Sequence, residues 1–180
     1  MTRIAVIERP GVLTRIFFRI GARMYGQVPT PQRLMAHRLP LMLGMGALYG
    51  AIEWLGTIDA RLRALLNLQV ATLYGVPYCM DIRHAVGVRS GTPAEVLADI
   101  GRYRESLHFT ARERAALEFC ERITRDDLEV SDGCRARLRD HFSEAEVVEL
   151  TFIVGYQTFA SKFAKAFRLA PQGFSAVEAR

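Results

Sequence analysis

Apolar residues recur at helical spacing along most of the chain, and no stretch sustains the apolar–polar alternation of a half-buried strand. In residues 12–25, three arginines form a basic stripe opposite the apolar positions, which predicts an amphipathic helix. An apolar helix with several glycines is expected from Pro40, and another from Asp59, its N-cap, to Tyr74, with Gly75 ending it. The pattern therefore predicts an all-helical fold.

Capping motifs predict where the later helices begin. In a capping box, a Ser or Thr side chain and a Glu three residues later cap each other's backbone, and such pairs occur at Thr92–Glu95, Thr110–Glu113 and Ser143–Glu146. The expected helices span about 93–103, 111–125, 132–141 and 144–168. The last one is apolar around most of its first half, so it needs cover that a second subunit could partly provide.

The stretch LRALLNLQVATLYGVPYCMDIRHAVGVRSG, residues 62–91, organises the rest of the chain. It predicts a buried helix, a tight turn and a second helix with Pro77 at its first position. Cys79 then lies in the first turn, and Arg83 lies on the same face one turn along. Both features lower a thiol pKa, and the thiolate is the reactive form. The alternative is a buried, inert cysteine.

Composition narrows the class of protein. The 180 residues predict one domain, 1–180, with residues 1–10 as a loosely ordered tail. The first apolar run is too short for a signal peptide, and none is long enough to cross a membrane, so a cytoplasmic location is expected. The net charge is +5, but the arginines are spread out and no nucleic-acid-binding motif is present. Three cysteines without zinc-ligand spacing predict reduced thiols, no metal and no cofactor.

Structural rather than catalytic roles are expected for three further side chains. Asp81 is interpreted as a partner of the helix dipole near the start of its helix. Glu149 is expected to form an ion pair with an arginine. Trp54 is expected to pack in the core rather than to line a pocket.

The sequence LNLQVATLYGVPYCMDIRHAVGVRSGTPAEVLADI resembles the carboxymuconolactone decarboxylase superfamily, which includes alkylhydroperoxidase D-like proteins. The resemblance continues through FTARERAALEFCERIT and FSEAEVVELTFIVGYQTFASKFAKAF to RLAPQGF. It implies an all-helical fold of roughly seven to eight helices around a central helical hairpin. It also implies a homo-oligomer (dimer, trimer or hexamer).

The peroxidase branch of that superfamily carries a glutamate, a CxxC pair and a histidine. Residue by residue, its attacking cysteine falls on Cys79, its resolving cysteine on Val76, its glutamate on Ala64 and its histidine on Arg83. His84 is adjacent, but five residues from Cys79 is about 140° around a helix, given about 100° per residue, so it points to another face. A sulfenic acid on Cys79 would then need an outside thiol, or Cys120 or Cys134 brought close by the fold.

Three functions stay open. The first is a thiol-dependent oxidoreductase that reduces hydroperoxides with reduced or altered activity, with Cys79 as nucleophile, Arg83 as its activator and His84 as a further candidate. The second is a cofactor-free decarboxylase or isomerase on a small carboxylate or lactone, with Arg83 as anion anchor and an acid from His37, His84 or Tyr74. The third is a non-catalytic protein that binds a ligand or forms oligomer contacts.

Overall fold

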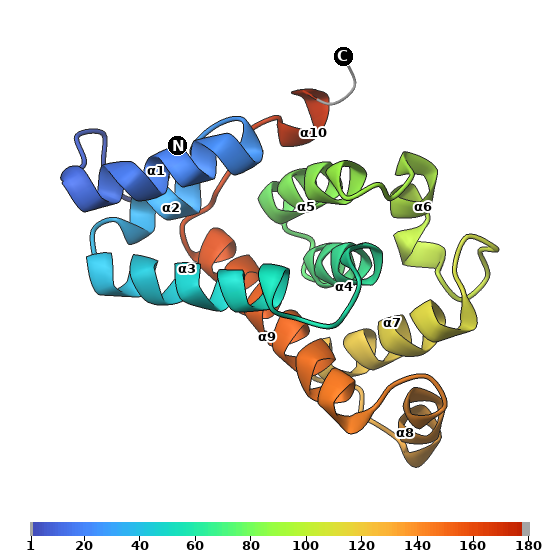
Figure 1. Cartoon of the computed structure of the whole chain (residues 1–180). Helices are drawn as coiled ribbons and strands as arrows, with labels where there is room; N and C mark the ends of the chain where they lie inside the picture. Colours follow the sequence, from blue (N-terminus) through green and yellow to red (C-terminus); the bar gives the residue numbers. More distant parts are fainter. Residues whose placement is uncertain (1, 178–180) are drawn as a thin grey trace.

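The computed structural model of the protein describes residues 2–177, which form ten α-helices and one short 3-10 helix (Figure 1). The longer helices are α1 (Val12–Tyr25), α3 (Leu39–Trp54), α4 (Ala60–Leu73), α5 (Pro77–Arg89), α7 (Ala111–Thr124), α8 (Asp132–Arg139) and α9 (Glu144–Ala166). The short ones are α2 (Thr30–Met35), α6 (Ala94–Ala98), η1 (Ile100–Arg102) and α10 (Phe174–Val177). The all-helical prediction is confirmed, and the short elements explain why the described residues form more helices than the seven to eight expected.

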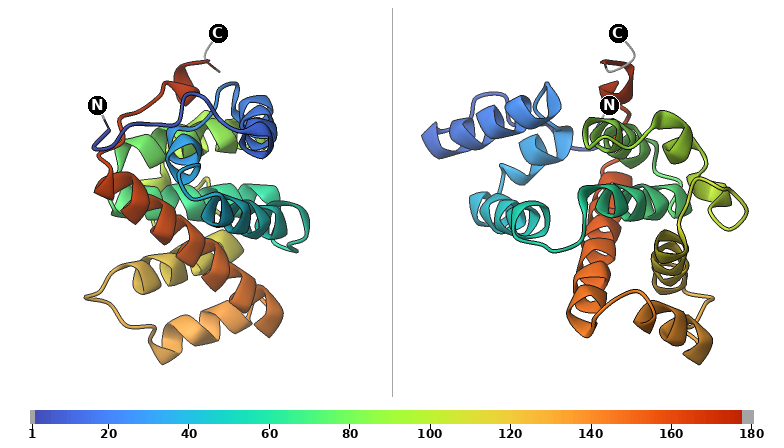
Figure 2. Two further views of the ribbon diagram at one scale, coloured as in Figure 1. Left: turned by 90° about the vertical axis from the view of Figure 1, so that its left-hand side faces the viewer. Right: turned by 45° about the vertical axis from the view of Figure 1, so that its right-hand side comes forward.

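Helix α4 is the centre of the fold. It packs against α5, α7 and α9, and its residues 64–71 are all buried. A helix that is buried on every side must be apolar around its circumference, and α4 has no charged residue after Arg63. Gly75, in the left-handed region at φ 59°, turns the chain so that α5 returns beside α4 as a hairpin (Figures 1 and 2). This hairpin is the central element that the sequence predicts.

Most of the predicted helix starts are confirmed. The side chain of Asp59 accepts a hydrogen bond from the backbone N–H of Leu62 at 2.8 Å. Both halves of the capping boxes at Thr110 and Ser143 are formed, and α5 begins at Pro77.

The box predicted at Thr92–Glu95 is wrong. Thr92 is buried and its hydroxyl has no partner, so Pro93 becomes the N-cap of α6 without a side-chain bond. The expected helix 93–103 is interrupted at Asp99, whose carboxylate accepts bonds from the Arg102 and Ser106 side chains beyond the break.

The chain's two ends are tied together at α5. The Asp81 carboxylate accepts hydrogen bonds from four successive backbone N–H groups, those of residues 172–175, and from the Ser175 hydroxyl, at 2.7–3.1 Å. Gln172 in turn bonds to Gln27 and to the backbone N–H of Thr30. Asp81 is therefore not a dipole partner for its own helix; it caps α10 and holds the C-terminal segment against α1 and α2.

Glu149 likewise caps backbone. Its carboxylate accepts hydrogen bonds from the backbone N–H groups of Thr57 and Ile58 and from the Thr57 hydroxyl, at 2.7–3.0 Å. The ion pair expected at Glu149 is thus replaced by a bond set that fixes the loop between α3 and α4.

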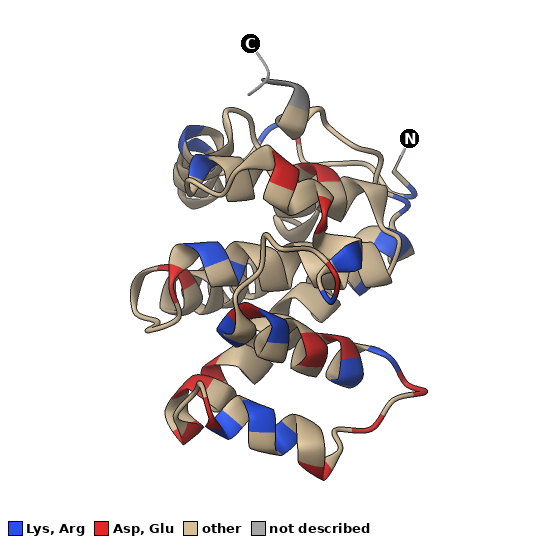
Figure 3. Ribbon diagram, turned by 90° about the vertical axis from the view of Figure 1, so that its right-hand side faces the viewer, with Lys and Arg blue, Asp and Glu red and all other residues tan. Residues whose placement is uncertain are grey.

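The surface of the described residues carries mixed charge and an apolar groove. Basic and acidic residues are interspersed along the ribbon in Figure 3 rather than gathered into one basic segment. Within residues 2–177, no helix is long and apolar enough to cross a membrane. Met45 and Leu48 of α3 face Val148, Phe152 and Phe159 of α9 across an apolar groove that is open to solvent. Val148, Phe152 and Phe159 of α9 therefore stay exposed in the single chain, and their cover by a second subunit stays a prediction.

Candidate active site around Cys79

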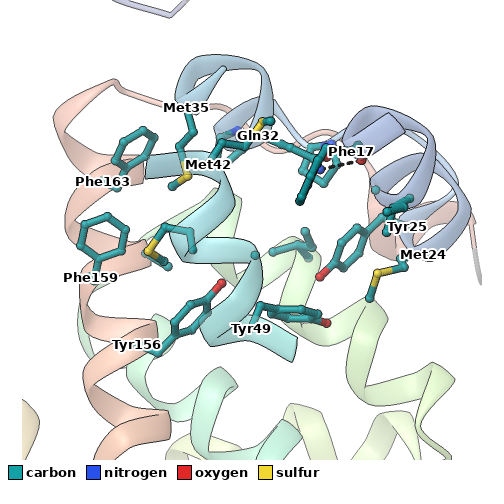
Figure 4. Close-up of a pocket in the computed structure, with 18 of the residues that line it drawn as sticks. Phe17, Met24, Tyr25, Gln32, Met35, Met42, Tyr49, Tyr156, Phe159 and Phe163 are labelled. Carbon is teal, nitrogen blue, oxygen red and sulfur yellow. Dashed lines mark hydrogen bonds between the residues drawn. The ribbon is translucent and has the colours of Figure 1, made fainter. Parts of the chain in front are cut away.

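A cavity of about 500 Å³ lies between the N-terminal helices α1–α3 and the paired helices α5 and α9. Aromatic and thioether side chains make up much of its wall, including Met45 and the residues Phe17, Met24, Met35, Met42, Phe159 and Phe163 that Figure 4 labels. Its size falls within the range of about 300–1,000 Å³ typical of small-molecule sites. Helix α5 contributes Tyr78, Cys79, Ile82 and Arg83 to it.

Cys79 and Arg83 lie together at this cavity, as the four-residue spacing predicts. Both are largely buried, with 3% and 8% of their surfaces exposed. Pro77 opens α5 as expected, so Cys79 lies in the first turn and Arg83 one turn further along the same face. The guanidinium keeps its positive charge in any protein setting, which makes it a fixed cation beside the thiol.

Two buried polar residues of α9 complete the surroundings of the thiol. Gln157 accepts a hydrogen bond from Arg83 Nε through its Oε1 at 2.6 Å and donates from its amide to the Ser161 hydroxyl at 3.1 Å. Both Gln157 and Ser161 also lie close enough to Cys79 to lower the pKa of its thiol. The sequence reasoning missed them, although two polar residues four apart in an apolar helix face are a usable signal, because a buried polar pair needs partners.

Burial raises the pKa of the Cys79 thiol, and this corrects the prediction of a lowered pKa. Desolvation is the largest influence, while Arg83, Ser161 and Gln157 each act to lower the pKa without overcoming it. The reason is that α9 and the N-terminal helices cover the start of α5, so that the predicted electrostatic support operates inside a dry site. At neutral pH the thiol is mainly protonated.

Three tyrosines from three different helices share the cavity with Arg83. Tyr25 ends α1, Tyr49 lies on α3 and Tyr156 lies on α9. Burial raises the pKa of all three, that of Tyr156 to about 12, so their hydroxyls stay protonated. Figure 4 shows the Tyr25 and Tyr49 hydroxyls pointing toward one another, in accord with a hydrogen bond between them.

Trp54 also lines this cavity, at the end of α3, and 68% of it is exposed. The expectation that it packs in the core is wrong. Helix α3 has its far side open to solvent, so its last turn lies at the rim of the cavity rather than beneath a covering layer.

The other candidate residues lie elsewhere. His84 does not line the cavity, and its Nδ1 is buried without a partner. His37 lies beyond the end of α2, where its Nε2 is 2.8 Å from the Ala5 carbonyl oxygen. Tyr74 packs between the core around α4 and a second group of buried apolar residues that includes Cys79 and Phe174. Cys120 and Cys134 belong to the core around α4 and are not among the residues at the cavity.

At the family's glutamate position, Ala64 lines a small space of about 30 Å³ on the other side of Arg83. Glu53 of α3 also borders this space and pairs with Arg63, with 3.0 Å between Oε2 and Nε. A carboxylate is therefore present near Arg83, but it comes from α3 and is bound to another arginine. Val76, at the resolving-cysteine position, is the buried N-cap residue of α5.

Comparison with known proteins shows which family the chain is similar to. Residues 40–122 match the carboxymuconolactone decarboxylase family, and the match includes α4, α5 and α7. The chain is 29% identical over 178 residues to the uncharacterized protein YnjA of Escherichia coli (strain K12), covering 96% of this chain and 92% of YnjA. The chain is therefore similar to the carboxymuconolactone decarboxylase/alkylhydroperoxidase D-like superfamily, in sequence over residues 40–122 and in fold over nearly its whole length.

Solved structures of this superfamily's fold match over nearly the whole chain. The debrominase Bmp8 superposes with a TM-score of 0.88 at 17% identity, covering 98% of this chain and 96% of Bmp8. A cysteine-to-alanine variant of Bmp8, in complex with 2,3,4-tribromopyrrole, matches equally well. An alkylhydroperoxidase AhpD core protein from Ralstonia eutropha JMP134 gives a TM-score of 0.85 at 19% identity, covering 96% of this chain and 94% of that protein. At these identities the likeness establishes the fold of the superfamily.

Proposed function

We propose that this protein is a thiol-dependent oxidoreductase that reduces an organic hydroperoxide through the single cysteine Cys79. The observation that carries the proposal is the position of Cys79. It is the one described cysteine at the cavity, and it shares its helix face with the buried cation Arg83. The similarity to alkylhydroperoxidase D-like proteins supports the same chemistry.

The reaction begins when Cys79 loses its proton. The thiolate sulfur attacks the terminal oxygen of the peroxide, an S–O bond forms as the O–O bond breaks, and the departing alkoxide takes up a proton to leave as the alcohol. The protonated hydroxyls of Tyr49 and Tyr156 are suitable donors for that proton. Because burial raises the thiol pKa, only a minor fraction of the protein is in the reactive form at neutral pH, which fits a reduced activity.

The return of Cys79 to the thiol requires an external thiol. Cys120 and Cys134 are buried in the core around α4, and Val76 replaces the resolving cysteine of the family, so none of these residues can form a disulfide with Cys79 in this fold. One external thiol condenses with the sulfenic acid and releases water. A second attacks the mixed disulfide, releases the external disulfide and restores Cys79.

A second candidate is reductive dehalogenation of a halogenated aromatic compound, which uses the same sulfur. It is favoured by the aromatic and thioether wall of the cavity, which suits a flat halogenated ring, and by the likeness of the whole chain to the debrominase Bmp8. The thiolate sulfur would bond to the halogen as the carbon–halogen bond breaks and the ring carbon takes a proton. An external thiol would then displace halide from sulfur, and a second one would restore Cys79.

The groove between α3 and α9 supports a homo-oligomer. Its exposed side chains include Leu48, Val148, Phe152 and Phe159, which are large apolar residues that a second copy of the chain would cover.

Substituting Cys79 tests both chemistries. Cumene hydroperoxide and 2,4,6-tribromophenol are offered separately with excess dithiothreitol, and peroxide loss or bromide release is followed. Cys79→Ser should reduce the productive turnover by more than about a hundredfold, whereas Cys120→Ala, a matched removal of a buried thiol, should keep it within about twofold. Turnover that survives Cys79→Ser, or no turnover of either compound by the unaltered protein, would contradict the proposal.

A further inference from the structure

The polar groups at one end of the cavity can all donate hydrogen bonds, and no carboxylate lies among the residues that line it. Arg83 and the hydroxyls of Tyr25, Tyr49 and Tyr156 lie there, and each hydroxyl is protonated at neutral pH. Tyr78 adds a hydroxyl that is buried and has no partner. A buried donor without an acceptor is unfavourable by about 1–3 kcal/mol, so this end of the cavity is suited to a ligand that brings acceptor atoms.

The charge of Arg83 is not matched by a carboxylate at the cavity. Its Nε donates a hydrogen bond to the neutral amide of Gln157. The carboxylate of Glu53 does not line this cavity; it borders the small space on the opposite side of Arg83 and pairs with Arg63 at 3.0 Å. A buried ion without a counter-ion is costly, and a ligand of opposite charge removes that cost. The ligand's acceptor atom is therefore expected to be an anion.

The rest of the cavity accommodates an apolar ring. Its wall is largely apolar and includes three Phe and four Met side chains, which pack well against aromatic ligands and adapt to their shape. The Oε1 atom of Gln32 is a buried acceptor without a hydrogen-bond partner. It lies against Gly21, where α1 and α2 meet, at the end of the cavity near Phe17 (Figure 4).

From these features we infer that the substrate is a small aromatic anion, with a phenolate or carboxylate oxygen bound by Arg83 and the cavity tyrosines and with its ring against the Phe and Met wall. This inference rests on the proposed function, since it names the substrate class of the Cys79 site. Cβ atoms one helical turn apart are separated by about 5–6 Å, so a ring anchored at Arg83 lies beside the Cys79 sulfur.

Binding can be tested without any chemistry. In the Cys79→Ser protein, which cannot turn over, binding is measured by equilibrium dialysis and by quenching of Trp54, the single tryptophan of the chain, which lines the cavity. Each of two probe pairs compares an anion with its neutral O-methyl derivative: 2,4-dinitrophenolate against 2,4-dinitroanisole, and 4-nitrobenzoate against methyl 4-nitrobenzoate. The anion of at least one pair should bind about tenfold or more tightly than its neutral partner, and the pair that shows this identifies the oxygen acid.

Substitutions then locate the anion. Arg83→Gln in the Cys79→Ser background should abolish the preference for the anion while the neutral partner still quenches Trp54, which shows that the cavity is intact. Arg23→Gln removes the same charge from the exposed side of α1 and should leave the preference unchanged. If Arg83→Gln does not fold, Tyr49→Phe is the decisive variant and should weaken anion binding about threefold to tenfold, the loss of roughly one hydrogen bond.

Neutral probes that bind as well as the anions, a preference that persists in Arg83→Gln, or no saturable binding at all would each overturn the inference. None of these results depends on turnover. A failure here therefore leaves the role of Cys79 to be judged by its own experiment.

Discussion

Cys79 and Cys120 are both buried free thiols with raised pKa values, but their surroundings differ in kind. Cys120 is fully enclosed in the core around α4, where burial raises its pKa to about 12. Cys79 borders a cavity, and three groups that lower its pKa surround it: Arg83, Ser161 and Gln157. The comparison shows that burial alone does not make a cysteine inert. What matters is whether the sulfur faces a space that a substrate can enter and whether a cation accompanies it.

The largest expected difference between the two thiols is in their rate of alkylation. In the folded protein, iodoacetamide should modify Cys79 more than about a hundredfold faster than Cys120, because only the first sulfur borders an accessible space and has the lower pKa. Mass spectrometry of peptides from partly modified protein measures both rates at once.

The pH dependence of the same reaction checks the direction of the pKa shift. Because the pKa of Cys79 is raised, its thiolate fraction at neutral pH is small. Its alkylation rate should therefore keep rising with pH beyond about 8.5, the usual pKa of a free cysteine. A rate that levels off near neutral pH would mean that Arg83 overcomes desolvation. Equal rates for Cys79 and Cys120 would remove the distinction between the two sites.

A smaller effect is expected when the cation beside Cys79 is removed. Arg83→Gln should raise the pKa of Cys79 further and slow its alkylation about tenfold, since an opposite charge at this range shifts a pKa by about one unit or more. Ser161→Ala removes one polar group that lowers the pKa of the thiol and should slow the reaction only about twofold to fivefold, an effect near that of one ordinary hydrogen bond. The measurement is the rate of Cys79 alkylation across pH in each variant.

The result would contradict our account of the site if the two variants changed in the opposite order, or if Arg83→Gln left the rate unchanged. Arg112→Gln, which removes an arginine that pairs with Asp59 and Glu146 outside the cavity, is the matched control and should leave the Cys79 rate unaltered.

The sequence predicts the parts of this site whose residues are close together along the chain, and it does not predict those that depend on how distant helices pack. Pro77, Cys79 and Arg83 could be placed on one helix face because their relation depends on helix geometry alone. Gln157 and Ser161 could not be assigned to the thiol, because the way α9 docks on α5 is a tertiary feature with no local signal. The sign of the Cys79 pKa shift was mispredicted for the same reason, since the covering helices decide how dry the site is.

The same limit applies to the fold. Capping boxes at Thr110 and Ser143 were predictable because both partners lie within one turn. The role of Asp81 was not, because the amides that it caps lie about ninety residues further along the chain. Long-range capping of this kind leaves no pattern in a single sequence.

The smallest expected effect is on the stability of the segment that packs beside the Cys79 cavity. Asp81 fixes the C-terminal segment, including Phe174, whose ring packs on Tyr25 and Tyr78 at the cavity. Asp81→Asn keeps the shape of the side chain but loses the charge that strengthens bonds to four backbone N–H groups, so the free energy of unfolding should fall by about 1–2 kcal/mol. For a chain of this size that is a decrease in melting temperature of about 2–8 °C, measurable by calorimetry.

The pH dependence of that loss has a defined sign. Hydrogen bonds from the backbone and from Ser175 outweigh desolvation and lower the pKa of Asp81, so its contribution is complete above the pKa of an unfolded aspartate, about 3.9, and disappears as the pH falls through the lower folded value. The difference in melting temperature between the unaltered protein and Asp81→Asn should therefore be constant at neutral pH and shrink below pH 4. Glu149→Gln is the parallel case, because Glu149 caps the loop before α4 in the same way but far from the Cys79 side of the cavity. If Asp81→Asn alone also slows alkylation of Cys79 or weakens ligand binding, the C-terminal clamp contributes to the shape of the cavity, whereas equal behaviour of the two variants would restrict Asp81 to stability.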